Sequence, residues 1–158
     1  MKVGIDTNVL IYAASGDDGR KRDIAQALLR AIKPDDVCFA SQVAGEFYNV
    51  SVKKLKRAPE SVSATLEVWS QVYGFRGHGQ TQMLAAMELS RDHNFQIWDA
   101  LILTIAADDG CRLFLTEDLH EGFRYRGVTI VNPFAERLHP LLASLLDSLP
   151  PMSPAGAP

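Results

Sequence analysis

Four acidic side chains mark points of the sequence where a strand ends or a helix begins: Asp6, Glu46, Asp99 and Asp118. Carboxylates that come close together repel one another, which raises their pKa values unless a cation lies among them. An oxygen-only ligand set favours Mg²⁺ or Mn²⁺ over Zn²⁺. Such a metal polarises a phosphoryl oxygen and makes bound water a better nucleophile. If the four acids converge, the chemistry they support is metal-dependent hydrolysis of a phosphodiester.

Each acid except Glu46 also has a local explanation that needs no active site. Asp6, or the asparagine two residues later, can cap a helix that starts shortly afterwards, and Asp99 can cap the apolar helix that follows it. Asp118 and Glu121 have the spacing of a capping pair for a single helical turn. Glu46 differs because apolar residues share its helix stripe, which turns its carboxylate toward the packed side.

Alternating strands and helices are expected to position these acids. Short runs rich in apolar and β-branched residues predict strands at the start of the chain and at residues 37–40, 111–115 and 128–131. Apolar residues at spacings of three and four predict helices over residues 20–32, 42–56, about 62–73, 80–93 and 98–107. This alternation predicts a parallel sheet whose strands all end at one edge, where ligands bind in open α/β sheets.

Length and composition fit one globular domain. The chain has 158 residues, of which 47% are apolar and 22% charged, and a domain of this size buries about 70% of its unfolded surface. We expect a single domain over residues 1–149 and a flexible Pro-rich tail over residues 150–158. The sequence has no signal-like start and no apolar run of about 20 residues, so we expect a cytoplasmic protein without membrane contact.

The net charge of −3 argues against bulk nucleic-acid binding by long-range attraction, although a local basic face remains compatible with it. The first candidates for such a face are Lys53, Lys54, Lys56 and Arg57. Cations at the end of a helix also suit the helix dipole, so this group has a purely structural explanation as well.

Both cysteines, Cys38 and Cys111, fall in apolar runs far apart in the sequence. We expect two small buried side chains in a reducing compartment, neither a disulfide nor a metal pair. The histidines show no ligand spacing either.

Several short motifs stand in an order that resembles a known family. They are Ile5-Asp6-Thr7-Asn8-Val9-Leu10, Ser41-Gln42 followed by Glu46-Phe47, Trp98-Asp99-Ala100-Leu101, and Leu115-Thr116-Glu117-Asp118-Leu119 followed by Gly122. Together they resemble a PIN domain over about residues 2–134. The stretch Val131-Asn132-Pro133-Phe134 is similar to the ending of VapC-type toxins of bacterial toxin-antitoxin pairs.

The resemblance implies a three-layer α/β/α fold with a central, mostly parallel sheet of four to five strands. It also implies an endoribonuclease that cuts RNA with one or two Mg²⁺ or Mn²⁺ ions. In that interpretation Asp6 and Asp99 bind metal directly, while Glu46 and Asp118 bind through water or a second ion.

The same resemblance assigns supporting roles and partners. Asn8 and Thr116 orient the ligands or a water molecule, as groups behind metal ligands do, and Glu117 is a spare acid. A homodimer is implied, together with a cognate antitoxin that lies in an apolar groove between the early helices and blocks the site.

Two other interpretations stay open. One is a catalytically inactive PIN-type module that binds RNA or protein, against which the complete set of four acids speaks. The other is a metal-dependent DNA nuclease or a phosphatase. A haloacid-dehalogenase-type phosphatase would carry a second Asp two residues after the nucleophilic one, where this chain has Asn8.

Overall fold

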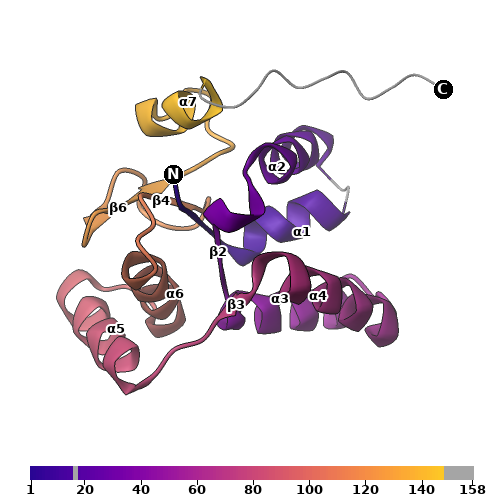
Figure 1. Ribbon diagram of the computed structural model, residues 1–158, viewed down its shortest axis with the longest axis horizontal. Coiled ribbons are helices and arrows are strands. Elements are labelled where there is room, and N and C mark those ends of the chain that lie inside the picture. Colours follow the sequence, from indigo (N-terminus) through magenta and orange to yellow (C-terminus); the bar gives the residue numbers. More distant parts are fainter. Residues whose placement is uncertain (16–17, 148–158) are drawn as a thin grey trace.

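The computed structural model describes residues 1–15 and 18–147. Its strands are β1 (Val3–Ile5), β2 (Val37–Ala40), β3 (Phe75–Arg76), β4 (Leu113–Leu115), β5 (Arg124–Tyr125) and β6 (Val128–Val131). Its helices are α1 (Thr7–Ser15), α2 (Gly19–Ala31), the 3₁₀ turn η1 (Pro34–Asp36), α3 (Ser41–Lys53), α4 (Pro59–Tyr73), α5 (Gln80–His93), α6 (Ile97–Asp108) and α7 (Pro140–Asp147). Figure 1 shows this arrangement.

One six-stranded sheet with the order β3-β2-β1-β4-β6-β5 forms the centre of the molecule. All neighbouring strands are parallel except β5, which pairs antiparallel with β6. Val3 lies between Val37 of β2 and Leu113 of β4. The chain moves outward from β1 through β2 to β3 and then returns to the other side of β1 as β4. Connections diverge at such a reversal and leave a crevice at the carboxyl ends of the strands.

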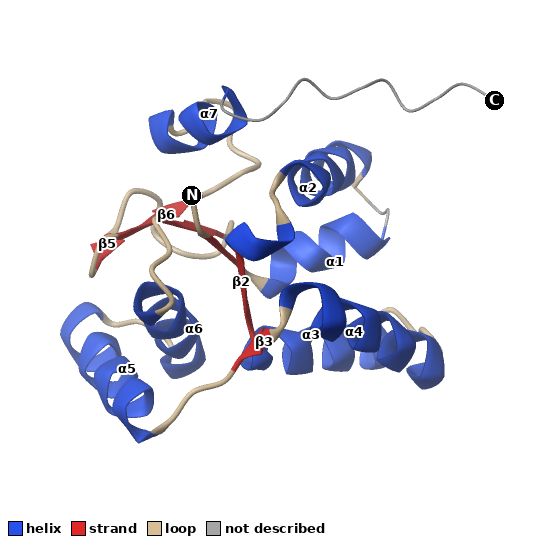
Figure 2. Cartoon of the chain, viewed as in Figure 1, coloured by secondary structure: helices blue, strands red, loops and turns tan. Residues whose placement is uncertain are grey.

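Helices cover both faces of this sheet. Figures 1 and 2 show α5 and α6 on one side and α1, α2, α3, α4 and α7 on the other. The expected three-layer α/β/α fold with a mostly parallel sheet is therefore confirmed. The expected count of four to five strands was too low, because β3 and β5 have only two residues each and carry no apolar alternation.

Helix α6 packs against the centre of the sheet. It is buried from Ala100 to Ala106, as its nearly all-round apolar sequence requires. Gly4 of β1 makes this approach close, since a Cβ atom there would lie 2.6 Å from Phe114 Cδ2 and 3.0 Å from Ala106 Cβ. A glycine at this position therefore sets the distance between α6 and the strands that carry the acids.

Two of the expected helix caps are wrong. The N-cap of α6 is Gln96, whose side chain accepts the N–H groups of Trp98 and Asp99, so Asp99 stands inside the first turn of the helix. No helix follows Asp118, because the chain continues from there through bends and a turn to β5. The carboxylates of Asp99 and Asp118 are thus free of capping roles.

The end of α3 differs from the prediction, and the predicted tail could not be compared. Helix α3 ends at Lys53, three residues before the expected end, so Lys54, Lys56 and Arg57 lie in the connection to α4. The expected Pro-rich tail at 150–158 lies outside the described residues. Among the helices that are described, none has the length and apolar character needed to cross a membrane.

Candidate active site

The carboxyl ends of the strands open onto a pocket of about 480 Å³ that all four acids line. Asp6 directly follows β1, Asp118 lies just beyond β4, Glu46 belongs to α3 and Asp99 to α6. We call these four side chains the carboxylate cluster: Asp6, Glu46, Asp99 and Asp118. All four were predicted from the sequence as site residues, and the structure brings them to the same cavity.

Asp6 is the most buried member of the carboxylate cluster, at 7% exposed. Its backbone N–H donates to the carbonyl of Leu115, which continues the pairing of β1 with β4 and fixes where the side chain leaves the sheet. Oδ1 accepts the backbone N–H of Thr7 at 2.6 Å, and Oδ2 accepts the Thr116 hydroxyl at 2.7 Å. Local capping thus occupies one oxygen of Asp6, while the other faces the neighbouring strand.

Asn8 ties together two acids that are far apart in the sequence. Its Nδ2 donates to Oδ2 of Asp6 at 3.1 Å and to Oδ2 of Asp118 at 3.0 Å, and it lies 3.1 Å from the Thr116 hydroxyl. The Thr116 hydroxyl also accepts the backbone N–H of Asp118. Asn8 and Thr116 therefore orient the two carboxylates that follow β1 and β4.

Two polar residues that the sequence analysis did not assign hold Glu46. The Thr7 hydroxyl donates to Oε2 at 2.8 Å, and the Gln42 amide donates to Oε1 at 3.0 Å. Gln42 stands four residues before Glu46, on the same face of α3, so its contact could have been inferred from helical spacing. The contact of Thr7 could not, because it joins α1 to α3.

Asp99 has the least support within the carboxylate cluster. No described residue donates a hydrogen bond to its carboxylate, although its backbone N–H is held by Gln96. Burial raises the pKa of Asp99 above its usual value, and the nearby charges of Glu46 and Asp118 add to this. Its oxygens are thus available to a ligand from the pocket.

The pKa of Asp6 is raised to about 6. Burial is the main cause, and the charges of Asp99 and Glu46 add to it, while the hydrogen bonds from Thr116 and Thr7 act in the opposite direction. At neutral pH the carboxylate cluster holds its negative charge at a cost in stability.

No basic side chain of the described residues forms an ion pair with the carboxylate cluster. Among the ion pairs of residues 1–15 and 18–147, none involves any of its members. Of the basic candidates, Lys54 alone lines the pocket; Lys53, Lys56 and Arg57 do not. Glu117 is not a spare acid, because it accepts hydrogen bonds from Tyr12 and Lys21.

Four uncompensated carboxylates around a solvent-connected pocket have the composition of a hard-cation site. One further atom fits a bound ligand, since Oδ1 of Asn8 is buried without a hydrogen-bond partner among the described groups. Apart from the Lys54 amine, the polar groups that line the pocket offer carboxylate, amide and hydroxyl oxygens, and the described lining residues include no sulfur or imidazole. This set suits Mg²⁺ or Mn²⁺ better than Zn²⁺.

Comparison with known families gives one match by sequence. The family model described as PIN domain matches residues 3–125, a stretch that holds every member of the carboxylate cluster. No curated protein matches the sequence at a significant level.

Solved structures with the same fold come from toxin-antitoxin systems. VapC20 from Mycobacterium tuberculosis, a sarcin-ricin loop cleaving toxin, aligns with a TM-score of 0.62 and 17% identity over 72% of this chain and 87% of that chain. A toxin-antitoxin complex from Klebsiella pneumoniae aligns with a TM-score of 0.65 and 22% identity over 84% and 98%. VapBC2 from Rickettsia felis, bound to a DNA fragment from its promoter, aligns with a TM-score of 0.59 and 18% identity over 84% and 98%. At these identities the likeness is one of fold.

Proposed function

Because the chain belongs to the PIN domain family, we propose that it is a metal-dependent endoribonuclease and that the carboxylate cluster is its catalytic site. One observation carries the proposal. Four acids from four separate segments line one pocket, and no Lys or Arg forms an ion pair with any of them among the described residues. A domain keeps such repulsion at a stability cost, and a bound cation that function requires would offset it.

In this proposal Mg²⁺ or Mn²⁺ is held directly by Asp6 and Asp99, and through water or a second ion by Glu46 and Asp118. When bound, the metal supplies polarisation of a phosphoryl oxygen and a more acidic water. Asp99 contributes most to metal binding, because no described residue donates a hydrogen bond to its carboxylate.

The surrounding polar residues act by positioning these acids. Asn8 and Thr116 keep the carboxylates of Asp6 and Asp118 turned toward each other. Thr7 and Gln42 fix both oxygens of Glu46. Each acid thereby has one preferred orientation before substrate arrives, which lowers the entropy cost of assembling the reacting groups.

We propose that the RNA backbone is contacted by Lys54, which lines the pocket. Lys53, Lys56 and Arg57 would extend this contact along the chain that leaves α3. Contacts of this kind supply affinity without sequence choice and weaken as the salt concentration rises.

Cleavage of a labelled RNA by the purified chain tests the function. We expect cleavage with Mg²⁺ or Mn²⁺, its loss with a chelator and its return when the metal is added back. Single-stranded DNA of the same sequence and p-nitrophenyl phosphate serve as the alternative substrates. Faster hydrolysis of either one would replace the ribonuclease by a DNA nuclease or a phosphatase.

A matched pair of variants distinguishes the loss of a carboxylate in the pocket from the loss of a carboxylate on the surface. Asp99→Asn should reduce RNA cleavage by more than the roughly 10–100-fold that loss of a supporting group costs. Asp92→Asn, the same change at an exposed position of α5, should leave the rate unchanged. Full activity of Asp99→Asn would show that the carboxylate cluster is not catalytic.

We further propose an antitoxin partner and a homodimer. In support, the Klebsiella pneumoniae neighbour is a toxin-antitoxin complex. The early helices form an apolar hollow of about 250 Å³ lined by Leu10, Ala13, Ala14, Gln26, Leu29, Arg30 and Trp69, which suits an apolar antitoxin segment. Exposed apolar residues on α4 and α5, Val68, Val72, Leu84 and Met87, suit a dimer contact.

Sedimentation of the chain alone and after co-expression with the product of a neighbouring small reading frame tests both partners. A dimer, and a complex that suppresses RNA cleavage, are expected. A monomer would remove the dimer from the proposal. Unchanged cleavage in the presence of the co-expressed protein would remove the antitoxin.

A further inference from the structure

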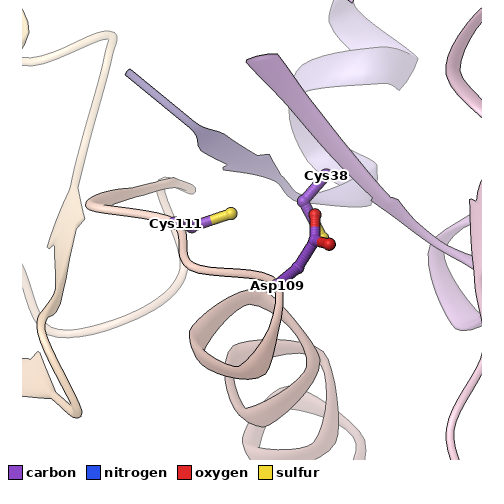
Figure 3. A group of neighbouring side chains, drawn as sticks. All are labelled: Cys38, Asp109 and Cys111. Atoms are coloured by element: carbon purple, nitrogen blue, oxygen red, sulfur yellow. The ribbon is translucent and has the colours of Figure 1, made fainter. Parts of the chain in front are cut away.

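A second cluster of potential ligands lies at the opposite edge of the sheet. Cys38 belongs to β2, while Asp109 and Cys111 belong to the turn between α6 and β4. Figure 3 shows the three side chains directed toward one another from these two segments. One ligand atom of each residue lies within 4.8 Å of those of the other two. The expectation that both cysteines are buried is confirmed. Although they are far apart in the sequence, the fold brings them close together.

The two sulfur atoms of this cluster are shielded from solvent. Cys38 is 2% exposed and Cys111 is 3% exposed, and both are free thiols. Cys111 and burial, in that order, raise the pKa of the Cys38 thiol above its usual value. A raised pKa argues against a reactive nucleophile, which needs a stabilised thiolate.

The carboxylate of Asp109 has one occupied oxygen and one free oxygen. Oδ1 lies 3.1 Å from Nζ of Lys2 and 3.2 Å from Nε of Arg76. Oδ2 is buried and has no partner of hydrogen-bond geometry among the described groups, although Asp109 contributes, after Cys111 and burial, to raising the pKa of the Cys38 thiol. A buried acceptor without a partner costs about 1–3 kcal/mol, and more when it is charged. A cation bound among the three side chains would give this buried oxygen a full partner.

We propose that Cys38, Asp109 and Cys111 form a zinc-binding site that joins β2 to the turn after α6. Two sulfurs select a thiophilic cation such as Zn²⁺ over Mg²⁺ or Mn²⁺. Zinc takes up one oxygen and two sulfur ligands, and its binding releases the thiol protons to solvent. A water molecule completes the usual four-coordinate shell.

The surrounding charges match such a site. Two thiolates and one carboxylate leave bound Zn²⁺ with one net negative charge, and the Lys2 ammonium and Arg76 guanidinium already contact the carboxylate. Outer groups that hydrogen-bond a ligating carboxylate orient it and strengthen the site. A hollow of about 190 Å³ lies beside the Asp109 ligand and is lined by Arg76, Gly77, Gln82, Ile105, Asp108 and Asp109.

Cobalt substitution tests the proposal independently of activity. The reduced, metal-free full chain is titrated with Co²⁺, which gives thiolate-to-cobalt charge-transfer absorption only when sulfur binds it. We expect this absorption to saturate at one equivalent in the unmodified protein and in Asp99→Asn, where the carboxylate cluster is impaired. It should disappear in Cys38→Ser and in Cys111→Ser, weaken in Asp109→Asn and persist in the neighbouring control Asp108→Asn. Absence of the absorption from the unmodified protein, or its survival in both cysteine variants, would overturn the site.

A second measurement needs no variant and so does not depend on how well the cysteine variants fold. X-ray absorption at the zinc edge of the protein loaded with one equivalent of Zn²⁺ should show two sulfur neighbours at about 2.3 Å and oxygen neighbours at about 2.0–2.2 Å. A shell of oxygen alone would assign the zinc to the carboxylate cluster and refute the proposal. Isolation of the chain with a Cys38–Cys111 disulfide that reducing agent does not convert to a zinc-binding form would refute it as well.

Discussion

The acidic residues at the two edges of the sheet lie in different charge environments. At the carboxyl edge, four acids share a pocket without an ion pair to any Lys or Arg of the described chain. At the amino edge, Asp109 contacts both Lys2 and Arg76 and stands beside two buried sulfurs. The carboxylate cluster has excess negative charge, and its acids offer only oxygen atoms as metal ligands. At the amino edge, the carboxylate charge is paired with two cations, and the two cysteines offer soft sulfur ligands.

This contrast separates a site that needs a hard cation from one that does not. Asp109 has two cationic partners, Lys2 and Arg76, so its negative charge does not by itself require a bound cation. In the carboxylate cluster, burial first and neighbouring negative charges second raise the pKa of Asp6 to about 6 and that of Asp99 above its usual value. If the account is right, changes at the carboxyl edge alter activity and the pH dependence of stability, whereas changes at the amino edge alter neither.

The largest expected effect is on stability as a function of pH. Asp6 has a pKa near 6 when folded and an ordinary value of 3.8 when unfolded, so the folded state binds the extra proton between these values. Stability of the metal-free protein should therefore fall as pH rises from about 4 to above 6, by roughly 2–3 kcal/mol. Urea unfolding at several pH values measures this fall.

Asp6→Asn should flatten that pH dependence, while Asp35→Asn at an exposed position should preserve it. A metal-free protein equally stable at pH 5 and pH 7, or an unchanged slope in Asp6→Asn, would mean that the two edges do not differ in electrostatic cost.

The next largest effect is expected from the Thr116 hydroxyl, which lies between Asp6 and Asp118. Thr116→Val removes the donor to Asp6 and the acceptor for the N–H of Asp118. RNA cleavage should fall about 10–100-fold, as is usual for a group that orients metal ligands. The matched change Thr104→Val removes a buried hydroxyl that donates to the carbonyl of Ala100 in its own helix, and it should leave cleavage within about twofold. Equal losses in both variants would point to general destabilisation.

The smallest effect is expected at the amino edge. Lys2→Met removes one cation from Asp109, and because both side chains are partly exposed, unfolding stability should fall by less than about 1 kcal/mol. Lys33→Met, at an exposed lysine, serves as the control in the same urea titration. Cleavage should be unaffected by either change. A marked loss of cleavage in Lys2→Met would connect the two edges, contrary to their proposed independence.

The site could be predicted from sequence where local order alone decides the position of a residue. Asp6 and Asp118 follow apolar strands, and a parallel sheet brings such positions to one edge. Glu46 was identified because its helix stripe is apolar. For Asp99 the cap assignment failed, since Gln96 takes that role, yet the residue still stands at the mouth of the pocket.

Features that depend on tertiary contacts could not be predicted. The strand β3 gains its identity from pairing with β2, through Phe75 opposite Phe39, and has no pattern of its own. The β5–β6 hairpin turns at Arg126 and Gly127, which both have positive φ; an arginine there lacks the usual Asn-Gly or Asp-Gly signal. Cys38 and Cys111 meet because the turn after α6 returns the chain to the sheet at the start of β4, which only β1 separates from β2.

A Mg²⁺ titration followed by thermal unfolding tests the central claim most directly, because thiolates do not compete for this ion. At one hundred times its Kd, Mg²⁺ should add about 2.7 kcal/mol, which for a chain of 158 residues corresponds to a rise in Tm of roughly 5–10 °C. The rise should be lost in Asp99→Asn and retained in Asp92→Asn. An unmodified protein whose Tm does not respond to Mg²⁺ or Mn²⁺ would contradict the account.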